Sequence, residues 1–419
     1  MGNYPVAKLK AGKDVPLRAG HPWIFSHALE RDADTAPGEI VEVLSSDGKS
    51  LGLGYRNPLT SIRVRMLTAD SNEKVDAGFF ARRLKRLDEW KSANLPAKTD
   101  GYRVAHAEVD GLPGLIVDRY ADVVVFQIHT AGMDLLRDQI VEGIKAALKP
   151  KAVVERSDVE ARNIEGLRDR PAGVLFGKVE KPVTFKEAGV KFYADVLRGQ
   201  KTGFFLDQRG ARLAVGQLAD GKRVLNLFGY TGAFSVHAAL GGASFVSTVD
   251  ISNAALETAM ENFKLNKLDP EDESRFEFLE ADVLDYLADI GNNQSHNDQL
   301  PKKSARNSKF EIPNSRFDLI VCDPPAFAKS EKHLPQALKA YTDVNAACLR
   351  LLEKGGILVT SSCSGRLDPE GFRNMLRIAA GRAGKQVRVR QWIGHEIDHA
   401  ERLAFPEGRY LKTAVLEVE

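Results

Sequence analysis

From near residue 190 onward, strand-like and helix-like segments alternate along the sequence, which leaves few folds open to this part of the chain. Short apolar runs rich in β-branched residues are each followed by a segment with helical periodicity. This pattern predicts strands over 223–228, 245–249, 275–279, 317–322 and 356–362. Strands separated by helices pair in parallel, so we predict a doubly wound, Rossmann-like α/β sheet. The last two strands, 386–393 and 410–417, have no clear helix between them and are predicted to form an antiparallel pair.

The remainder of the chain follows other patterns, and 419 residues exceed what one hydrophobic core usually organises. Residues 1–72 combine short alternating strands with dense turn residues, which predicts a small β-barrel. Residues 73–189 mix helices and strands and are predicted to form a small α+β domain. Residues 190–419 then form the third domain, which makes the chain multi-domain α/β. The polar, aperiodic stretch 291–313 is predicted to be a flexible surface loop.

Composition excludes some classes of function. Lys and Arg total 59 against 57 Asp and Glu, so the net charge is +2 and nucleic-acid affinity must come from local patches. No apolar run approaches the roughly 20 residues that cross a bilayer. The first residues also lack the apolar core of a signal peptide, so we expect no membrane association. The three cysteines are too few for a disulfide framework, which favours a cytoplasmic location.

A glycine turn after the first of these strands suggests a ligand site. Gly229-Tyr230-Thr231-Gly232-Ala233 lies between the strand, which ends at Phe228, and a helix, where glycines let the backbone approach a ligand. Asp250 ends the next strand and Asp282 follows the third, so carboxylates gather at one edge of the sheet. Each of them could instead cap the helix that follows it. The G-x-G-x-x-G spacing of dinucleotide sites is absent, so an adenosine without phosphates fits this turn better.

The fourth strand ends in the sequence DPPAF at residues 323–327. An acid followed by two prolines is a rigid turn that continues neither as helix nor as strand. Such a turn fixes the carboxylate of Asp323 at the edge of the sheet and leaves Phe327 nearby as a stacking surface. This pairing suits a planar base with hydrogen-bonding edges.

The three cysteines fall in different environments. Cys348 lies on the apolar stripe of a helix and is predicted to be core. Cys322 precedes Asp323 in a strand, and because side chains alternate, it is predicted to point away from the site. Cys363 lies in the polar turn SSCSG after the fifth strand. A thiolate there is a candidate nucleophile, although an incidental exposed thiol is the alternative.

Several motifs resemble those of class I S-adenosylmethionine-dependent RNA methyltransferases, specifically the large-subunit rRNA cytosine-5 methyltransferase I family. The segment GHPWIFS (20–26) is similar to the start of a PUA-type RNA-binding domain, and DGLPGLIVDRYAD (110–122) to the family's middle domain. The matching motifs of the third domain are KTGFFLDQRG (201–210), VLNLFGYTGAFS (224–235), FDLIVCDPPAF (317–327), SSCSG (361–365) and FPEGRYLK (405–412).

The resemblance implies S-adenosylmethionine as cofactor and large-subunit rRNA as partner, with no metal. The turn from Phe228 through Gly229, Tyr230 and Gly232 would contact the methionine portion, Asp250 the ribose and Asp282 the adenine. Gln208 and Arg209 would meet the cofactor carboxylate.

The resemblance also implies that Asp323 holds the pyrimidine edge and that Cys363 attacks C6 of cytosine. Many such enzymes carry a second cysteine after the two prolines, where this chain has Ala326-Phe327. His399 is a candidate proton acceptor and equally a candidate structural histidine.

The sequence is also compatible with two other functions. An enzyme of the same fold that methylates a base nitrogen would use the same Asp-Pro-Pro turn and need no cysteine. A non-catalytic RNA-binding assembly factor would be expected to have a damaged glycine turn, which is not observed. The oligomeric state is also left open, with a homodimer as one option.

Overall fold

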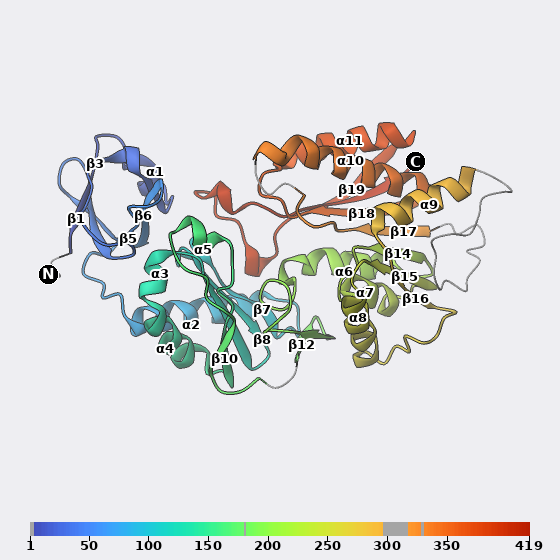
Figure 1. The fold of residues 1–419 in the computed structure, drawn as a ribbon, viewed down its shortest axis with the longest axis horizontal. Coiled ribbons are helices and arrows are strands. Elements are labelled where there is room, and N and C mark those ends of the chain that lie inside the picture. The colour runs from blue at the N-terminus through green and yellow to red at the C-terminus, as the bar shows by residue number, and fades with distance from the viewer. Residues whose placement is uncertain (1–3, 180–181, 296–316, 328–330) are drawn as a thin grey trace. The chain divides into compact units, whose positions relative to one another are not determined.

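The computed structural model describes residues 4–179, 182–295, 317–327 and 331–419. They form two compact units, Met1–Asp207 with Glu396–Gly408, and Gln208–His395 with Arg409–Glu419. Figure 1 shows the elements of each unit. The division into 1–72, 73–189 and 190–419 stays a prediction, and the structure groups 190–207 and 396–408 with the N-terminal unit. Every helix in the described residues is too short or too polar to cross a membrane.

The N-terminal unit begins with a six-stranded sheet in the order β2-β6-β5-β4-β1-β3. Its strands β1, β2 and β3 are hard to recognise from alternation, because three or four residues barely show a period of two. The elements are β1 (Val6–Leu9), α1 (Val15–Arg18), β2 (Trp23–Phe25), β3 (Leu29–Arg31), β4 (Ile40–Leu44), β5 (Ser50–Arg56) and β6 (Ile62–Thr68).

A five-stranded sheet, β11-β10-β9-β8-β7, follows in the same unit, with a two-stranded hairpin, β12-β13. Residues 131–148 form two helices rather than one, because the backbone leaves helical geometry at Leu136 (φ −93°, ψ 11°). The elements are α2 (Ala77–Asn94), β7 (Gly101–His106), β8 (Leu115–Tyr120), β9 (Val123–Ile128), α3 (Ala131–Leu135), α4 (Arg137–Leu148), β10 (Ala152–Glu155), α5 (Ala161–Ile164), β11 (Gly173–Phe176), β12 (Val183–Glu187) and β13 (Val190–Ala194).

These two sheets share hydrophobic packing. Leu53, Tyr55 and Leu67 of the first sheet belong to the same buried cluster as Phe79 and Ile140. The Tyr55 hydroxyl donates to the carbonyl oxygen of Pro113 at 2.8 Å, which satisfies a polar group inside this cluster. The first sheet therefore depends on the second for part of its core.

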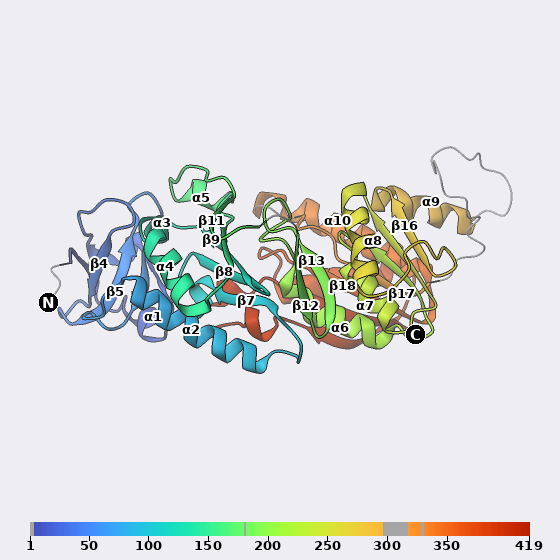
Figure 2. The ribbon, with the colours of Figure 1, turned by 90° about the horizontal axis from the view of Figure 1, so that it is seen from below.

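The C-terminal unit contains a seven-stranded sheet in the order β16-β15-β14-β17-β18-β20-β19. Its first five strands are parallel, while β20 pairs antiparallel with both β18 and β19. This confirms the predicted Rossmann-like sheet with an antiparallel final pair. Helices α10 and α11 cover one face, and α6, α7 and α8 cover the other (Figures 1 and 2).

The elements of this unit are α6 (Arg209–Leu218), β14 (Arg223–Leu227), α7 (Ala233–Leu240), β15 (Phe245–Asp250), α8 (Asn253–Leu265), β16 (Phe276–Glu280), α9 (Val283–Ser295), β17 (Phe317–Cys322), α10 (Leu334–Leu351), β18 (Leu352–Ser362), α11 (Pro369–Ala383), β19 (Val387–Ile393) and β20 (Lys412–Val418). The loop predicted over 291–313 lies outside the described residues, except that 291–295 continue α9.

Candidate active site

The register of the central strands brings the predicted site residues to one edge of the C-terminal sheet. Leu227 at the end of β14 pairs with Cys322 of β17, and Cys322 pairs with Thr360 of β18. On the other side, Asp250 ends β15 opposite Glu280 of β16. The turn after β14, the carboxylate after β17 and the cysteine loop after β18 therefore all leave the sheet at its carboxyl edge, where α/β folds bind ligands.

The turn after β14 has a strained backbone. Phe228 and Tyr230 have φ of 56° and 47°, in the left-handed region that non-glycine residues rarely adopt. Such residues cost on the order of 1–3 kcal/mol each and gather at ligand sites. The backbone N–H of Tyr230 donates to Oδ2 of Asp250 at 2.8 Å, so the next strand helps to hold the turn.

The two glycines of this turn are required by packing. A Cβ atom at Gly229 would lie 2.5 Å from Cγ2 of Thr248, and one at Gly232 would lie 2.6 Å from Cβ of Ala259. Gly232 also has a φ of 72°, which suits glycine. The glycines bring β14, β15 and α8 close together, and their contact with a cofactor remains a prediction.

The two candidate carboxylates of the cofactor site differ in their surroundings. Asp250 is half-buried, and it accepts the backbone N–H of Ser252 at 2.9 Å in addition to that of Tyr230. Asp282 is exposed and accepts the N–H groups of Leu284 at 2.8 Å and Asp285 at 3.2 Å, so it caps α9. A carboxylate has about four lone-pair sites, so both residues keep acceptor capacity for a ligand.

Gln208 and Arg209 stand at the start of α6, and both are buried. Nε2 of Gln208 donates to Oδ1 of Asp323 at 2.9 Å. The structure thus joins a residue expected near the cofactor to the residue expected at the base. Arg209 is fully buried, which a guanidinium tolerates only with compensating partners.

A tyrosine of α10 holds the Asp-Pro-Pro turn through its hydroxyl group. The hydroxyl of Tyr341 donates to the carbonyl oxygen of Pro325 at 3.4 Å and accepts the N–H of Phe327 at 3.3 Å. The rings of Tyr341 and Phe327 have their centroids 4.7 Å apart. Burial raises the pKa of Tyr341, which keeps its hydroxyl protonated as a donor. Tyr341 carries no distinguishing signal in the sequence, since its position in the apolar face of a helix resembles ordinary core.

The cysteines have the environments that alternation and periodicity predicted. Cys322 and Cys348 are fully buried in the core between the sheet and α10, whereas Cys363 is partly exposed. A hydrogen bond with Cys348 and burial together raise the pKa of Cys322, so it stays a thiol. Of the three, Cys363 alone has the exposure that a nucleophile requires.

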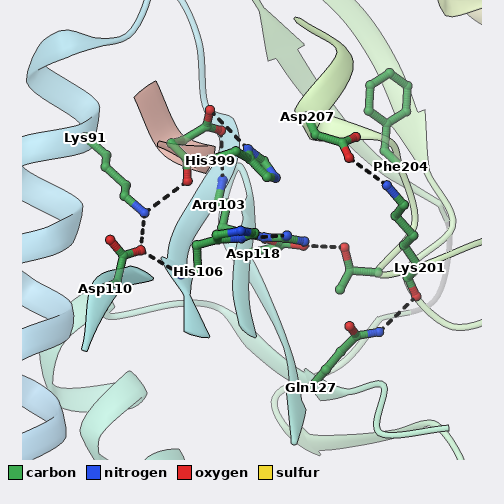
Figure 3. A network of polar contacts seen from close by, with 12 residues as sticks. Lys91, Arg103, His106, Asp110, Asp118, Gln127, Lys201, Phe204, Asp207 and His399 are labelled. Atoms are coloured by element: carbon green, nitrogen blue, oxygen red, sulfur yellow. Dashed lines mark hydrogen bonds and ion pairs between the residues drawn. The ribbon is translucent and has the colours of Figure 1, made fainter. Parts of the chain in front are cut away.

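His399 and the KTGFFLDQRG motif take part in a buried polar network of the N-terminal unit (Figure 3). Nε of Arg103 pairs with Oδ1 of Asp118 at 2.7 Å, and Lys201 pairs with Asp207 at 2.8 Å. His399 is fully buried, its Nδ1 lies 3.3 Å from Oδ1 of Asp398, and burial lowers its pKa. These contacts favour the structural interpretation of this histidine.

Two segments of the chain match known families. Residues 7–69 match a PUA-like domain, and residues 168–292 match the S-adenosylmethionine-dependent methyltransferases. A protein described as a methyltransferase and crystallised with SAH superposes with a TM-score of 0.80 at 21% identity, over 99% of this chain and 100% of the other. A second structure from Streptococcus mutans, described as SAM-dependent, gives a TM-score of 0.78 at 22% identity over the same shares. These structures show the shared fold, and with the matched segment they define an S-adenosylmethionine-dependent methyltransferase.

Relatives of known name extend over the whole chain. Ribosomal RNA large subunit methyltransferase I of Aeromonas hydrophila is 39% identical over 412 residues, which are 97% of this chain and 98% of the relative. The protein of the same name from Shewanella denitrificans is 39% identical over 415 residues, 98% of each. The chain belongs to the ribosomal RNA large subunit methyltransferase I family, which confirms the resemblance seen in its motifs.

Proposed function

We propose that this protein methylates C5 of a cytosine in large-subunit rRNA, with Cys363 as the nucleophile. The supporting observation is that the one partly exposed cysteine lies beyond β18, and β18 pairs with β17, the strand that Asp323 follows. The substrate class follows from the name of the relatives and from the PUA-like domain. We expect the reaction to take place in the cytoplasm, on rRNA.

The residues at the carboxyl edge of this sheet fit S-adenosylmethionine. Asp250 offers carboxylate oxygens at the end of β15, where acids commonly hold ribose hydroxyls. The turn from Phe228 to Gly232 would face the methionine portion, Asp282 the adenine, and Gln208 or Arg209 the cofactor carboxylate. Bound S-adenosylmethionine supplies an electrophilic methyl group on a sulfonium.

The chain's own residues would supply the remaining chemistry. C5 of cytosine is a poor nucleophile, and addition of the Cys363 thiolate to C6 moves electron density onto C5. Asp323 would hold the hydrogen-bonding edge of the base during this addition. After C5 has taken the methyl group, it loses its proton to a base, and the thiolate leaves C6. Covalent catalysis thus divides one difficult step into easier ones.

The proposal assigns both attack and departure to a single cysteine. Ala326 and Phe327 occupy the place after the prolines, so no second thiol is available there. Cys322 is fully buried with a raised pKa and is not a substitute. In this proposal, Cys363 both attacks C6 and departs from it, and the flipped base stacks near Phe327.

The proposal is tested with two alanine variants and one trap. Cys363→Ala is expected to abolish methyl transfer while cofactor binding, measured by calorimetry, is retained. Cys322→Ala, the matched control, is expected to keep substantial activity. Wild-type protein with RNA carrying 5-fluorocytosine is expected to form a denaturation-resistant adduct, because fluorine at C5 cannot leave as a proton. Retained activity in Cys363→Ala without a trapped adduct would instead indicate methylation of a base nitrogen.

A further inference from the structure

The loop that carries Cys363 is fastened by a buried lysine. Lys412, the first residue of β20, pairs in register with Ser362 and is only 6% exposed. Its ammonium group donates three hydrogen bonds, to the carbonyl oxygens of Ser364 at 2.7 Å, Leu367 at 2.6 Å and Tyr410 at 2.7 Å. A lysine nitrogen has three protons, and all three are used.

Two of these bonds hold the backbone that follows the cysteine. Ser364 follows Cys363 directly, and Leu367 precedes Asp368, which caps α11 by accepting the N–H of Gly371. The backbone that follows the cysteine is therefore tied to one nitrogen atom, while Ser362 before it is held by its strand pairing with Lys412. A neighbouring pair, Ser361 and Thr413, adds a side-chain hydrogen bond of 2.8 Å between β18 and β20. The loop has a fixed geometry even though Cys363 itself is partly exposed.

Burying an ammonium group is expensive, so its retention calls for an explanation. Burial lowers the pKa of Lys412 to about 8, while the neighbouring Cys363 opposes that shift. The interaction is reciprocal, since a cation that is stabilised by a thiolate also stabilises the thiolate. A neutral side chain could donate hydrogen bonds to these carbonyl oxygens without the cost of burying a charge. The charge of Lys412 therefore indicates a role in addition to holding the loop.

We propose that Lys412 is a positioning residue for Cys363, holding its loop through three carbonyl oxygens and favouring its thiolate form by charge. This inference rests on the proposed function, in which Cys363 attacks the base. In the part of the chain that the structure describes, Asp368 and Arg409 also act on Lys412, and Tyr341 lies near Cys363. Asp323 also acts on Tyr341. Among these groups, Lys412 is the buried cation bonded to the cysteine loop.

The test measures the ionisation of the thiol directly, without RNA or cofactor. The rate at which iodoacetamide alkylates Cys363 is followed by mass spectrometry as a function of pH. In Lys412→Met the midpoint is expected to rise by about one pH unit or more, which lowers the rate near pH 7 roughly tenfold. Lys412→Arg, which keeps the charge, is expected to stay closer to wild type.

Matched controls distinguish the effect of the Lys412 charge from a general effect of substitution on folding. Lys385 also donates to a backbone carbonyl, that of Leu352 at 2.9 Å, but it is bonded to no part of the cysteine loop in the described contacts. Lys385→Met is expected to leave the alkylation midpoint unchanged. If Lys412→Met does not fold, Lys412→Gln against Lys412→Arg gives the same comparison, since both donate hydrogen bonds and only one is charged.

The outcomes for this inference and for the proposed function differ. An alkylation midpoint in Lys412→Met equal to wild type would overturn the role of Lys412, whatever the 5-fluorocytosine trap shows. A raised midpoint together with full activity of Cys363→Ala would support the Lys412–Cys363 coupling, and it would reject Cys363 as the nucleophile. A raised midpoint with a lowered kcat and an unchanged KM for S-adenosylmethionine supports both.

Discussion

Gln208 donates a hydrogen bond from Nε2 to Oδ1 of Asp323 at 2.9 Å, across 115 positions of sequence. A carboxylate only accepts, so the amide nitrogen must face it. Among the described residues, Oε1 of Gln208 has no hydrogen-bond partner. The start of α6 thereby sets the orientation of the acid that follows β17. This relation suggests a second role for a residue that the motif resemblance assigns to the cofactor.

Replacing Gln208 separates these two roles. Gln208→Leu removes a hydrogen bond to a charged acceptor, worth about 1.5–3 kcal/mol, so kcat is expected to fall roughly ten- to hundred-fold. If the bond to Asp323 is its main role, the affinity for S-adenosylmethionine measured by calorimetry stays near wild type. Gln217→Leu, an exposed glutamine on the same helix, is the control. Loss of cofactor affinity with kcat retained would favour the role at the cofactor.

Asp250 is expected to contribute strongly to cofactor affinity. Asp250→Ala loses a charge-assisted acceptor for the ribose and also the bond that holds Tyr230. The affinity should fall by about 1.5–3 kcal/mol, or roughly ten- to hundred-fold in Kd. Asp285→Ala, an exposed acid near the same edge, should bind the cofactor normally. Unchanged calorimetric affinity in Asp250→Ala would remove this residue from the site.

Gly132 is expected to be intolerant of any side chain. A Cβ atom there would lie 2.0 Å from the ring of Tyr55, in the core shared by the first two sheets. Gly132→Ala should reduce the free energy of unfolding by about 1–3 kcal/mol, as overpacking does. Gly173→Ala, where the added atom meets nothing within 4 Å, should change it little. Equal unfolding midpoints in denaturant for both variants would contradict the close packing.

His129 is expected to make the protein less stable in acid. Burial and the nearby Arg103 and Arg162 lower its pKa from 6.5 to about 4. Between these values the unfolded chain binds a proton that the folded protein does not, so stability falls as the pH drops from 6.5 towards 4. The loss from this group should reach about 1–2 kcal/mol at pH 5, with allowance for its partial exposure.

The comparison of variants isolates this contribution from the carboxylates that titrate in the same range. The free energy of unfolding is measured by urea denaturation at pH 7 and at pH 5. Its decrease between these two pH values should be smaller for His129→Gln than for wild type. His27→Gln, at an exposed position, should follow the wild-type curve. A pH dependence in His129→Gln as steep as that of wild type would show that His129 accepts its proton in the folded state.

The order of the main elements, and the edge of the sheet at which the candidate site residues gather, follow from the sequence. Strand β17 was predicted with its observed bounds, because a buried parallel strand is a continuous apolar run that ends at a charged turn. The burial of Cys348 and Cys322 also followed from local periodicity. Local sequence patterns suffice to predict an element when one of its faces is buried and the residue that follows it cannot continue the helix or strand.

The tertiary structure decided which of these local patterns meet. No pattern near Gln208 refers to Asp323, and none near Lys412 refers to the loop of Cys363. The same holds for Tyr341 beneath the Asp-Pro-Pro turn. The first two contacts join elements far apart in the chain, because the pairing order of the strands and the closing of β20 against β18 bring them together. Tyr341 instead meets a turn that lies 16 residues earlier. Hydrogen bonds depend on distances of a few tenths of an ångström, which periodicity does not encode.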